Sequence, residues 1–424
     1  MLKKTWLALA LAVLVLLPGC ITEEDGNAPG EEGVVELSVW HSFAAESKEE
    51  AAFRAHITAF EAANPGVMVD VTGVPFAEAD RQFMIAAQGG EAPDLVRLSS
   101  DQLGKIGDVR VSGQPLLEDL RPHLTPNERS SFDVRALHAM RYEGALLGLP
   151  ASQDCLSLFY NPLLFDAAGV GYPDASWTHE DLLQAAMDLT AGDVQGLAMP
   201  VKDAYWWFGF QAGFGGALFD ANGTPTLDSN GSAEAMRWVV GLEQVHGVVL
   251  QGTQSESMKT QFLSSKAAMI VDGPWNWATY EAGRIPVQQT LLPTVGIDGD
   301  RIAPLVTYKG WSVAKQSEEK VWATKLALHL SSAEVQRTFA LETYTLPTHV
   351  EVYDDPAVVE DPVLSGFLEQ LMVGTPAPTT RGMALVYDPL VSAFENVYAG
   401  TMEAEEALRR ADEALEADLA EAAA

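Results

Sequence analysis

The sequence predicts an α/β protein built around mainly parallel sheets, and three observations lead to that class. The chain has 424 residues, 47% of them apolar, which is enough to bury a sizeable core over roughly two or three domains. Segments that alternate like strands are followed at short intervals by segments with helical periodicity. After residue 20, no apolar run approaches the ~20 residues of a transmembrane helix.

The first expected strand is 36–40, Glu-Leu-Ser-Val-Trp, in which apolar and polar residues alternate. A helix should follow, because Phe53, Ile57 and Phe60 fall on one helical face. The sequence Asn-Pro-Gly at 64–66 should end that helix.

A second strand is expected at 67–71, a helix at 76–87 and a third strand at 94–98. Strands separated by single helices pair in parallel and form an α/β layer. Ligands of such sheets lie beyond the carboxyl ends of the strands, which points to 40–42 (Trp-His-Ser) and 99–101 (Ser-Ser-Asp).

The middle of the chain should be mostly helical. One helix is expected to be capped by Ser176 or Thr178, and another to begin at Ser232. Between them, 220–224 (Asp-Ala-Asn-Gly-Thr) indicates a turn of a hairpin.

Strand patterns return at 267–271 and at 305–307. Near the end, apolar residues at helical spacing across 404–415 predict an amphipathic helix.

The first twenty residues resemble a targeting segment. Lys3 and Lys4 precede an apolar run at 6–17, whose ~12 residues would span ~18 Å as a helix against a ~30 Å hydrocarbon core. The run ends in Leu-Pro-Gly before Cys20, which resembles the lipobox at which prokaryotic lipoproteins are cleaved and lipidated. We therefore expect a lipoprotein signal peptide at 1–20 with Cys20 as the lipidation site. An ordinary signal peptide, or an uncleaved anchor, is the alternative.

Five acidic residues with Gly, Asn and Pro predict a flexible tether at 21–34, on a folded part that is extracytoplasmic and lipid-anchored to the cell membrane. With Cys20 occupied, Cys155 is left unpaired, and its apolar neighbours indicate a small buried side chain rather than a nucleophile.

The net charge of −33, from 26 Lys and Arg against 59 Asp and Glu, argues against nucleic acid as a partner, since phosphate neutralisation needs clustered cations. Two cysteines exclude a cysteine-cluster zinc site, and the eight histidines are scattered, so no metal and no cofactor is expected.

Motifs of catalysis are not found: there is no Gly-x-Ser-x-Gly elbow, no phosphate-binding loop and no His-Glu-x-x-His. Carboxylates are abundant enough that a glycosidase pair could be drawn from several of them: Asp94, Asp101, Asp154, Asp203 and Asp272. We nevertheless expect a protein that is not an enzyme.

Aromatic residues next to polar ones are the informative feature. Tyr205, Trp275, Trp311 and Tyr387 stand close to Asp, Asn or Lys and not within apolar stripes. Such a mixture suits carbohydrate, because the flat C–H faces of a pyranose bury well on an aromatic ring while carboxylates accept hydrogen bonds from its hydroxyls. Trp238 and Trp322, by contrast, lie on helical stripes and are expected in the core.

From about Val35 to Leu415 the chain resembles the extracellular solute-binding proteins of ABC importers, closest to the maltose/maltodextrin-binding group. The most specific segment is 267–277, Ala-Ala-Met-Ile-Val-Asp-Gly-Pro-Trp-Asn-Trp. Further matches are Leu-Leu-Pro-Thr at 291–294, Ala-Pro-Asp-Leu at 92–95 and Leu-Ser-Leu-Phe-Tyr-Asn at 156–161.

The resemblance implies a two-lobed periplasmic-binding-protein fold, with a sheet flanked by helices in each lobe and the ligand cleft between them. The first lobe would contain 35–152 plus 311–352, and the second 153–310 plus 353–424. The protein would capture a maltose- or maltodextrin-like oligosaccharide by hinge closure and deliver it, as a monomer, to the transmembrane subunits of an ABC permease.

The resemblance also implies roles for individual residues. Trp275, Tyr205 and Tyr387 would stack on sugar rings, the last in place of the group's tryptophan. The carboxylates expected to bind hydroxyl groups are Asp101, Asp154 and Asp203, and the further candidates are Trp40 and Trp311.

The chain departs from the group at Gln102, Leu98 and 40–42, which leaves the sugar open among a glucose oligomer, trehalose and another disaccharide. Alternatives are a binder of glycerol phosphate or a polyamine on the same fold, a surface glycosidase, and a sensory receptor without transport.

Overall fold

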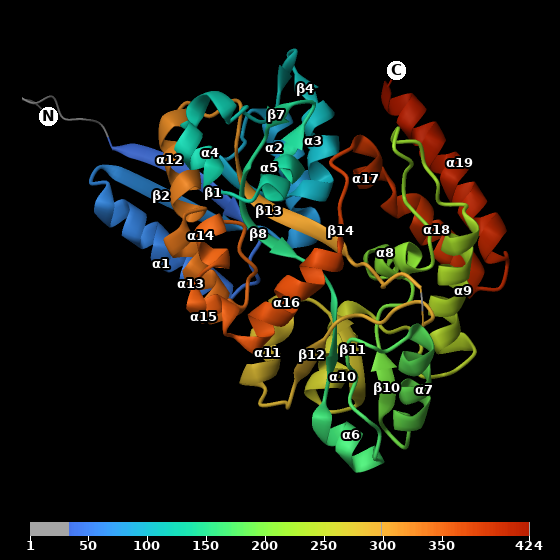
Figure 1. The fold of residues 1–424 in the computed structure, drawn as a ribbon. Coiled ribbons are helices and arrows are strands. Elements are labelled where there is room, and N and C mark those ends of the chain that lie inside the picture. The colour runs from blue at the N-terminus through green and yellow to red at the C-terminus, as the bar shows by residue number, and fades with distance from the viewer. Residues whose placement is uncertain (1–33, 298, 424) are drawn as a thin grey trace, which may run out of the picture. The chain divides into compact units, whose positions relative to one another are not determined.

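The computed structural model describes residues 34–297 and 299–423, so the expected signal peptide, the tether up to 33 and Cys20 lie outside the described residues. Residues Val35–Ala424 form one compact unit. Its two main sheets, one of six strands and one of four, carry helices around them (Figure 1). The expected α/β class is confirmed.

The six-stranded sheet consists of β1 (Val35–His41), β2 (Val67–Gly73), β3 (Leu95–Ser99), β8 (Leu149–Asp154), β13 (Leu305–Val313) and β14 (Thr375–Pro376). β1 lies between β2 and β3 and is parallel to both, as the spacing of the strands predicts. β13 runs antiparallel to β3 and β8 and parallel to β14. β13 is an interior strand, with β3 on one side and β8 and β14 on the other, and every one of its residues is buried.

The four-stranded sheet has the order β10 (Gln195–Ala198), β11 (Ala267–Asp272), β9 (Ser157–Tyr160) and β12 (Gln288–Thr290). Only β10 and β11 are parallel, whereas β9 is antiparallel to β11 and to β12. This differs from the expected mainly parallel sheet. The reason is that β9 enters directly from β8 of the other sheet, and not over a crossover helix that would impose parallel pairing.

Two further pairs of strands form small hairpins: β4 (Arg110–Val111) with β5 (Gln114–Pro115), and β6 (Arg141–Tyr142) with β7 (Ala145–Leu146). The helices of the first half of the chain are α1 (Lys48–Ala63), α2 (Ala79–Gly89), α3 (Leu103–Asp108), α4 (Pro126–Ser130), α5 (Val134–Ala139), α6 (Pro162–Ala168), α7 (His179–Leu189) and α8 (Ala204–Gly213). Those of the second half are α9 (Asn230–Gln244), α10 (Ser255–Leu263), α11 (Trp277–Ala282), α12 (Lys320–Leu330), α13 (Ala333–Thr343), α14 (Val350–Tyr353), α15 (Pro356–Val359), α16 (Pro362–Val373), α17 (Arg381–Leu385), α18 (Tyr387–Tyr398) and α19 (Ala404–Ala423). Single 3-10 turns are η1 (Phe76–Glu78), η2 (Ser100–Gln102), η3 (Arg121–His123) and η4 (Pro274–Asn276).

The ends of the helices follow from local sequence. Ser47 caps α1 by accepting a hydrogen bond from the backbone N–H of Glu50, and Gly66, at a φ of +95°, turns the chain after it into β2. Thr178, one of the two expected caps, forms a capping box with Asp181 at the start of α7.

α9 begins earlier than expected. Its cap is Ser229, whose side chain accepts a hydrogen bond from the backbone N–H of Ser232. Ser232 is buried in the first turn, where its hydroxyl meets that of Ser229 at 2.8 Å. Both Ser229 and Ser232 are residue types that commonly begin a helix, and the predicted start at Ser232 was wrong.

The chain passes between the two sheets in short steps. Only Cys155 and Leu156, both buried, separate β8 from β9, and the return runs from the end of β12 at Thr290 to the start of β13 at Leu305. β13 lies wholly in the six-stranded sheet and so begins before the boundary expected at 310/311. The division into lobes at 152/153, 310/311 and 352/353 stays a prediction.

Candidate ligand-binding site

A buried ion pair lies where β8 and β13 meet. Asp154 ends β8 and is paired in register with Thr307 of β13. The Nζ of Lys309 lies 2.9 Å from a carboxylate oxygen of Asp154 and donates to the Thr307 hydroxyl at 2.7 Å. Asp154 and Lys309 are each 9% exposed, so the pair is held by the central strand of the six-stranded sheet.

A second carboxylate follows the end of β3. Asp101 lies on η2 and accepts hydrogen bonds from the Ser99 hydroxyl and, at 3.1 Å, from the Gln102 amide. The Tyr387 hydroxyl, at the start of α18, donates to it at 3.3 Å. Burial, and then the negative charge of Asp101, raise the pKa of the Tyr387 phenol well above its ordinary value.

The aromatic partners of these carboxylates come from elements next to the four-stranded sheet. Tyr205 lies in the first turn of α8, where the Asp203 side chain caps the helix by accepting from the Tyr205 backbone N–H at 2.9 Å. Trp275 lies on η4, directly after β11. The two ring centroids are 6.4 Å apart at an interplanar angle of 53°, and both rings are partly buried.

Tyr205 connects the aromatic pair to the carboxylates. Burial, followed by the charge of Asp154, raises the pKa of its phenol well above the ordinary value, and its hydroxyl interacts with that of Thr307. The negative charge of Asp101 also raises the pKa of the Tyr205 phenol, and the negative charge of Asp203 also raises the pKa of the Tyr387 phenol. Six predicted residues thus lie in one group, which we call the aromatic–carboxylate group: Asp101, Asp154, Asp203, Tyr205, Trp275 and Tyr387.

The group presents ring faces beside hydrogen-bond donors and acceptors. Burial raises the pKa of Asp203, the carboxylate that caps α8, and the pKa values of both tyrosine hydroxyls lie well above their ordinary value. Such an arrangement can take up a neutral, hydroxyl-rich molecule with apolar faces.

Sequence and structure comparisons assign the chain to a known family. The profile of the bacterial extracellular solute-binding proteins matches residues 55–365. This chain belongs to that family.

Relatives of this solute-binding protein include the maltodextrin-binding protein MdxE of Bacillus subtilis, 24% identical over 94% of each chain. The galactooligosaccharide-binding protein of Bacillus subtilis is also 24% identical, over 96% of this chain and 94% of its own. A solved structure, the maltose/maltodextrin-binding domain MalE from Bdellovibrio bacteriovorus bound to maltotriose, has a TM-score of 0.82 at 25% identity and covers 91% of this chain and all of its own. This likeness confirms the predicted two-lobed fold.

Two predicted site residues of this solute-binding protein lie outside the aromatic–carboxylate group. Trp311 is 2% exposed and stacks on Phe53 of α1, with ring centroids 5.4 Å apart at 16°. It is therefore a core residue, because β13 is buried along its whole length and leaves no exposed face at position 311. Trp40 lies within β1, partly buried against the hydrophobic core.

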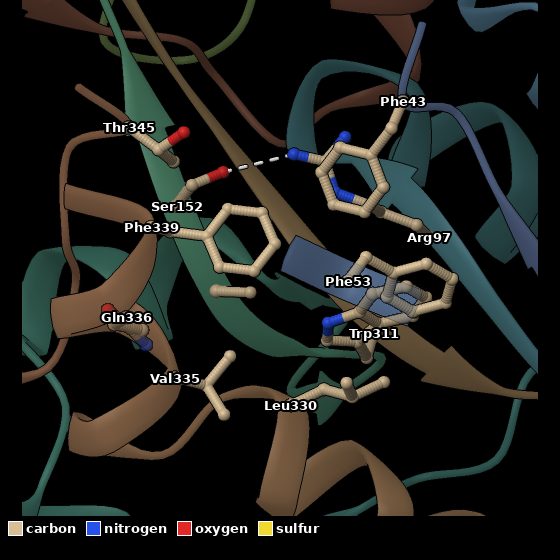
Figure 2. Close-up of a pocket in the computed structure, with 11 residues that line it drawn as sticks. Phe43, Phe53, Arg97, Ser152, Trp311, Leu330, Val335, Gln336, Phe339 and Thr345 are labelled. Carbon is tan, nitrogen blue, oxygen red and sulfur yellow. Dashed lines mark hydrogen bonds between the residues drawn. The ribbon is translucent and has the colours of Figure 1, made fainter. Parts of the chain in front are cut away.

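A small cavity of about 20 Å³ lies beside Trp311, between the six-stranded sheet and α13 (Figure 2). Its polar edge is Arg97 of β3, whose guanidinium lies 4.3 Å from the ring centre of Phe43 and donates to the Ser152 hydroxyl at 3.2 Å. Glu49 of α1, whose pKa is raised by burial, accepts from Thr345 at 3.1 Å.

Sequence reasoning missed two residues of the site. Lys309 stands two residues before Trp311, and a lysine inside a strand pattern signals a buried partner. Phe76 of η1 is 54% exposed, and its ring centre lies 5.3 Å from the Nζ of Lys309. Its signal is the position just past the carboxyl end of β2, where ligands of parallel sheets lie.

The other sequence predictions concern cysteine, metals and membranes. Cys155 is buried and has no disulfide partner among the described residues, and burial raises the pKa of its thiol well above the ordinary value. Within the described residues, no cluster of three or more His, Cys, Asp or Glu is arranged to hold a metal ion. None of the helices described at 34–297 and 299–423 combines the length and the apolar character needed to cross a bilayer.

Proposed function

We propose that this chain is the substrate-binding lipoprotein of an ABC sugar importer. It captures a maltose- or maltodextrin-like oligosaccharide and delivers it to the membrane permease. The observation that carries the proposal is the aromatic–carboxylate group, which offers ring faces and hydrogen-bonding oxygens within one site. The names of the relatives, which include binders of maltodextrin and maltotriose, point the same way.

Trp275, Tyr205 and Tyr387 stack on the sugar rings, and Asp101, Asp154 and Asp203 accept hydrogen bonds from sugar hydroxyls. Asp154 lies on β8 of the six-stranded sheet and Asp101 directly after β3 of the same sheet, whereas Trp275 lies directly after β11 of the four-stranded one. A sugar that contacts both sheets stabilises the closed arrangement of the lobes over the open one, and this differential affinity drives closure. The permease then recognises the closed form.

The protein acts outside the cytoplasm, held at the membrane by lipid on Cys20, and it binds as a monomer without breaking glycosidic bonds. Product analysis after incubation with maltodextrin tests the last point. Release of shorter sugars would make the protein a glycosidase, for which the carboxylates of the site supply candidates.

Calorimetric titration of the purified protein tests the sugar. The panel contains maltose, maltotriose, trehalose, a galacto-oligosaccharide and glycerol phosphate. We expect heat of binding with the maltodextrins, and Trp275→Ala should weaken that binding by about 2 kcal/mol, as for a central aromatic anchor. Trp322→Ala is the matched control, since this partly buried indole lies on α12, with the Nζ of Lys325 3.9 Å from its ring centre.

Galacto-oligosaccharide is in the panel because the relative named for binding it is as similar to this chain as the maltodextrin-binding relative is. Binding of galacto-oligosaccharide alone would contradict the proposed maltodextrin-like ligand. If no compound of the panel gives heat of binding, the carbohydrate assignment is wrong.

A further inference from the structure

We propose that Asp272 is a positioning residue, which fixes the turn that carries Trp275 and whose negative charge is required for full oligosaccharide affinity. The inference rests on the proposed function, in which Trp275 stacks on sugar. The sequence offers Asp272 only as one member of a possible glycosidase pair.

The hydrogen bonds of Asp272 enclose the turn. This residue ends β11 and is fully buried. One carboxylate oxygen accepts from the backbone N–H of Gly273 at 2.8 Å, and the other accepts from the Asn276 amide at 3.0 Å and from the Tyr280 hydroxyl. Trp275 lies between the first two of these partners in the chain, so its backbone is held on both sides.

The indole of Trp275 depends closely on this backbone. Its ring folds back over Gly273, where an added Cβ would lie only 2.1 Å from a ring carbon. A change in the turn therefore moves the ring. The same end of β11 is tied to α8, because the indole N–H of Trp206 donates to the carbonyl of Val271 at 2.6 Å, next to Tyr205.

The charge of Asp272 is costly to keep. No ion pair within 4.0 Å involves it among the described residues, and burial raises its pKa to about 6 although three groups donate to it. Two titratable groups lower the pKa of Asp272 in part: the hydroxyl of Tyr280 on α11, by its hydrogen bond, and Lys259 on α10, by its positive charge. Glu256 of α10 raises the pKa of Tyr280.

Because the pKa of Asp272 is raised, the effect of its charge on stability differs from its effect on the position of the turn. A carboxyl group whose folded pKa is raised contributes stability below its ordinary value of 3.8, and that contribution is lost as the pH rises through about 6. At neutral pH the ionised group thus disfavours folding, yet only the ionised form accepts all three hydrogen bonds. After protonation one oxygen must itself donate, and one of the three donors loses its acceptor.

The test compares Asp272→Asn with the wild type by calorimetry with maltotriose at pH 7.5 and pH 5. We expect Asp272→Asn to bind roughly tenfold more weakly at pH 7.5, the scale of one hydrogen bond to a charged group, without a lower unfolding temperature. The wild type should weaken towards the variant at pH 5. Asp193→Asn, an exposed residue before β10, is the matched control and should bind like the wild type.

A double-mutant cycle shows whether Asp272 acts through Trp275. In a Trp275→Ala background, Asp272→Asn should have no further effect on affinity. An equal loss in both backgrounds, or wild-type affinity of Asp272→Asn at pH 7.5, would overturn the inference. If Trp275→Ala itself leaves affinity unchanged, it is the stacking role in the proposed function that fails.

Tyr280→Phe covers the case in which Asp272→Asn does not fold. It removes one donor and keeps the carboxylate, so it should weaken maltotriose binding by a smaller factor, provided that Trp275 is present. Unchanged affinity of this variant, together with a wild type that binds equally at both pH values, would also overturn the inference.

Discussion

Tyr205 and Tyr387 show at the scale of single residues how burial prepares a binding surface. Burial and neighbouring carboxylates raise the pKa of each phenol, which favours the neutral hydroxyl that can donate a hydrogen bond. Tyr387 uses its proton on Asp101, and this bond holds the carboxylate without cancelling its charge. With the Ser99 hydroxyl and the Gln102 amide as its other donors, Asp101 keeps about one free lone pair for a ligand that brings its own donor.

Lys309 should be essential for stability, because it neutralises Asp154 inside the sheet. Both side chains are nearly buried, and removing one partner of such a pair leaves an uncompensated charge. We expect Lys309→Met to lower the free energy of unfolding by about 3 kcal/mol, measured by urea denaturation.

The control for Lys309→Met is the double variant Lys309→Met/Asp154→Asn, in which no charge is left. It should recover much of the lost stability. If the single variant were as stable as the wild type, the ion pair would not contribute to the free energy of unfolding.

Phe76 should contribute to affinity and not to folding. More than half of its surface is exposed, so its truncation to Ala removes little buried area, but its ring stands beside Lys309 at the site. We expect Phe76→Ala to weaken maltotriose binding by about 1 kcal/mol, measured by calorimetry, with an unchanged unfolding temperature. Met68→Ala is the control, because Met68 is an exposed apolar residue on β2. It should change neither the affinity for maltotriose nor the unfolding temperature.

At the scale of elements, α8 joins helix capping to binding through Asp203. Its carboxylate accepts from the backbone N–H of Tyr205 and thereby fixes the start of the helix that carries this tyrosine. Asp203→Ser keeps an acceptor for the cap and should preserve stability, whereas Asp203→Ala should lose about 1 kcal/mol in thermal denaturation.

Both variants remove the negative charge, and both should bind maltotriose more weakly if Asp203 accepts a hydrogen bond from the sugar. Full affinity of Asp203→Ser would show that Asp203 only caps the helix.

Local patterns predicted the elements that depend on their own sequence. The strands around Val39, Val69 and Met269 and the helix that ends near Asn64 were expected within one or two residues, because alternation, helical spacing and caps are local signals. Pairing is not local: nothing near β13 shows that it runs antiparallel to β3, or that Trp311 therefore packs on Phe53.

The candidate site was predicted where residues stand at the ends of elements. Asp101, Tyr205 and Trp275 follow a strand or begin a helix, and such positions can be read from the sequence. Lys309 and Phe76 could not be assigned in this way, because their roles arise only when β13 passes Asp154 and η1 approaches β13.

At the scale of the whole molecule, the site is divided between the two sheets, which are joined by the short step from β8 to β9 and by residues 291–304 between β12 and β13. β8 supplies Asp154 and then continues, after Cys155 and Leu156, into β9 of the other sheet. A chain that crosses in this way can bend at the crossing while each sheet keeps its own hydrogen bonds. Ligand contacts on both sides then favour the closed arrangement.

Closure should therefore be visible in solution. We expect saturating maltotriose to reduce the radius of gyration in small-angle X-ray scattering, because a sugar held by Asp101 and Asp154 on one side and by Trp275 on the other draws the sheets together. Trp275→Ala should need a higher maltotriose concentration for the same change, since it weakens the contact on one side only. A radius of gyration that stays constant while calorimetry reports tight binding would mean that this protein binds sugar without closing.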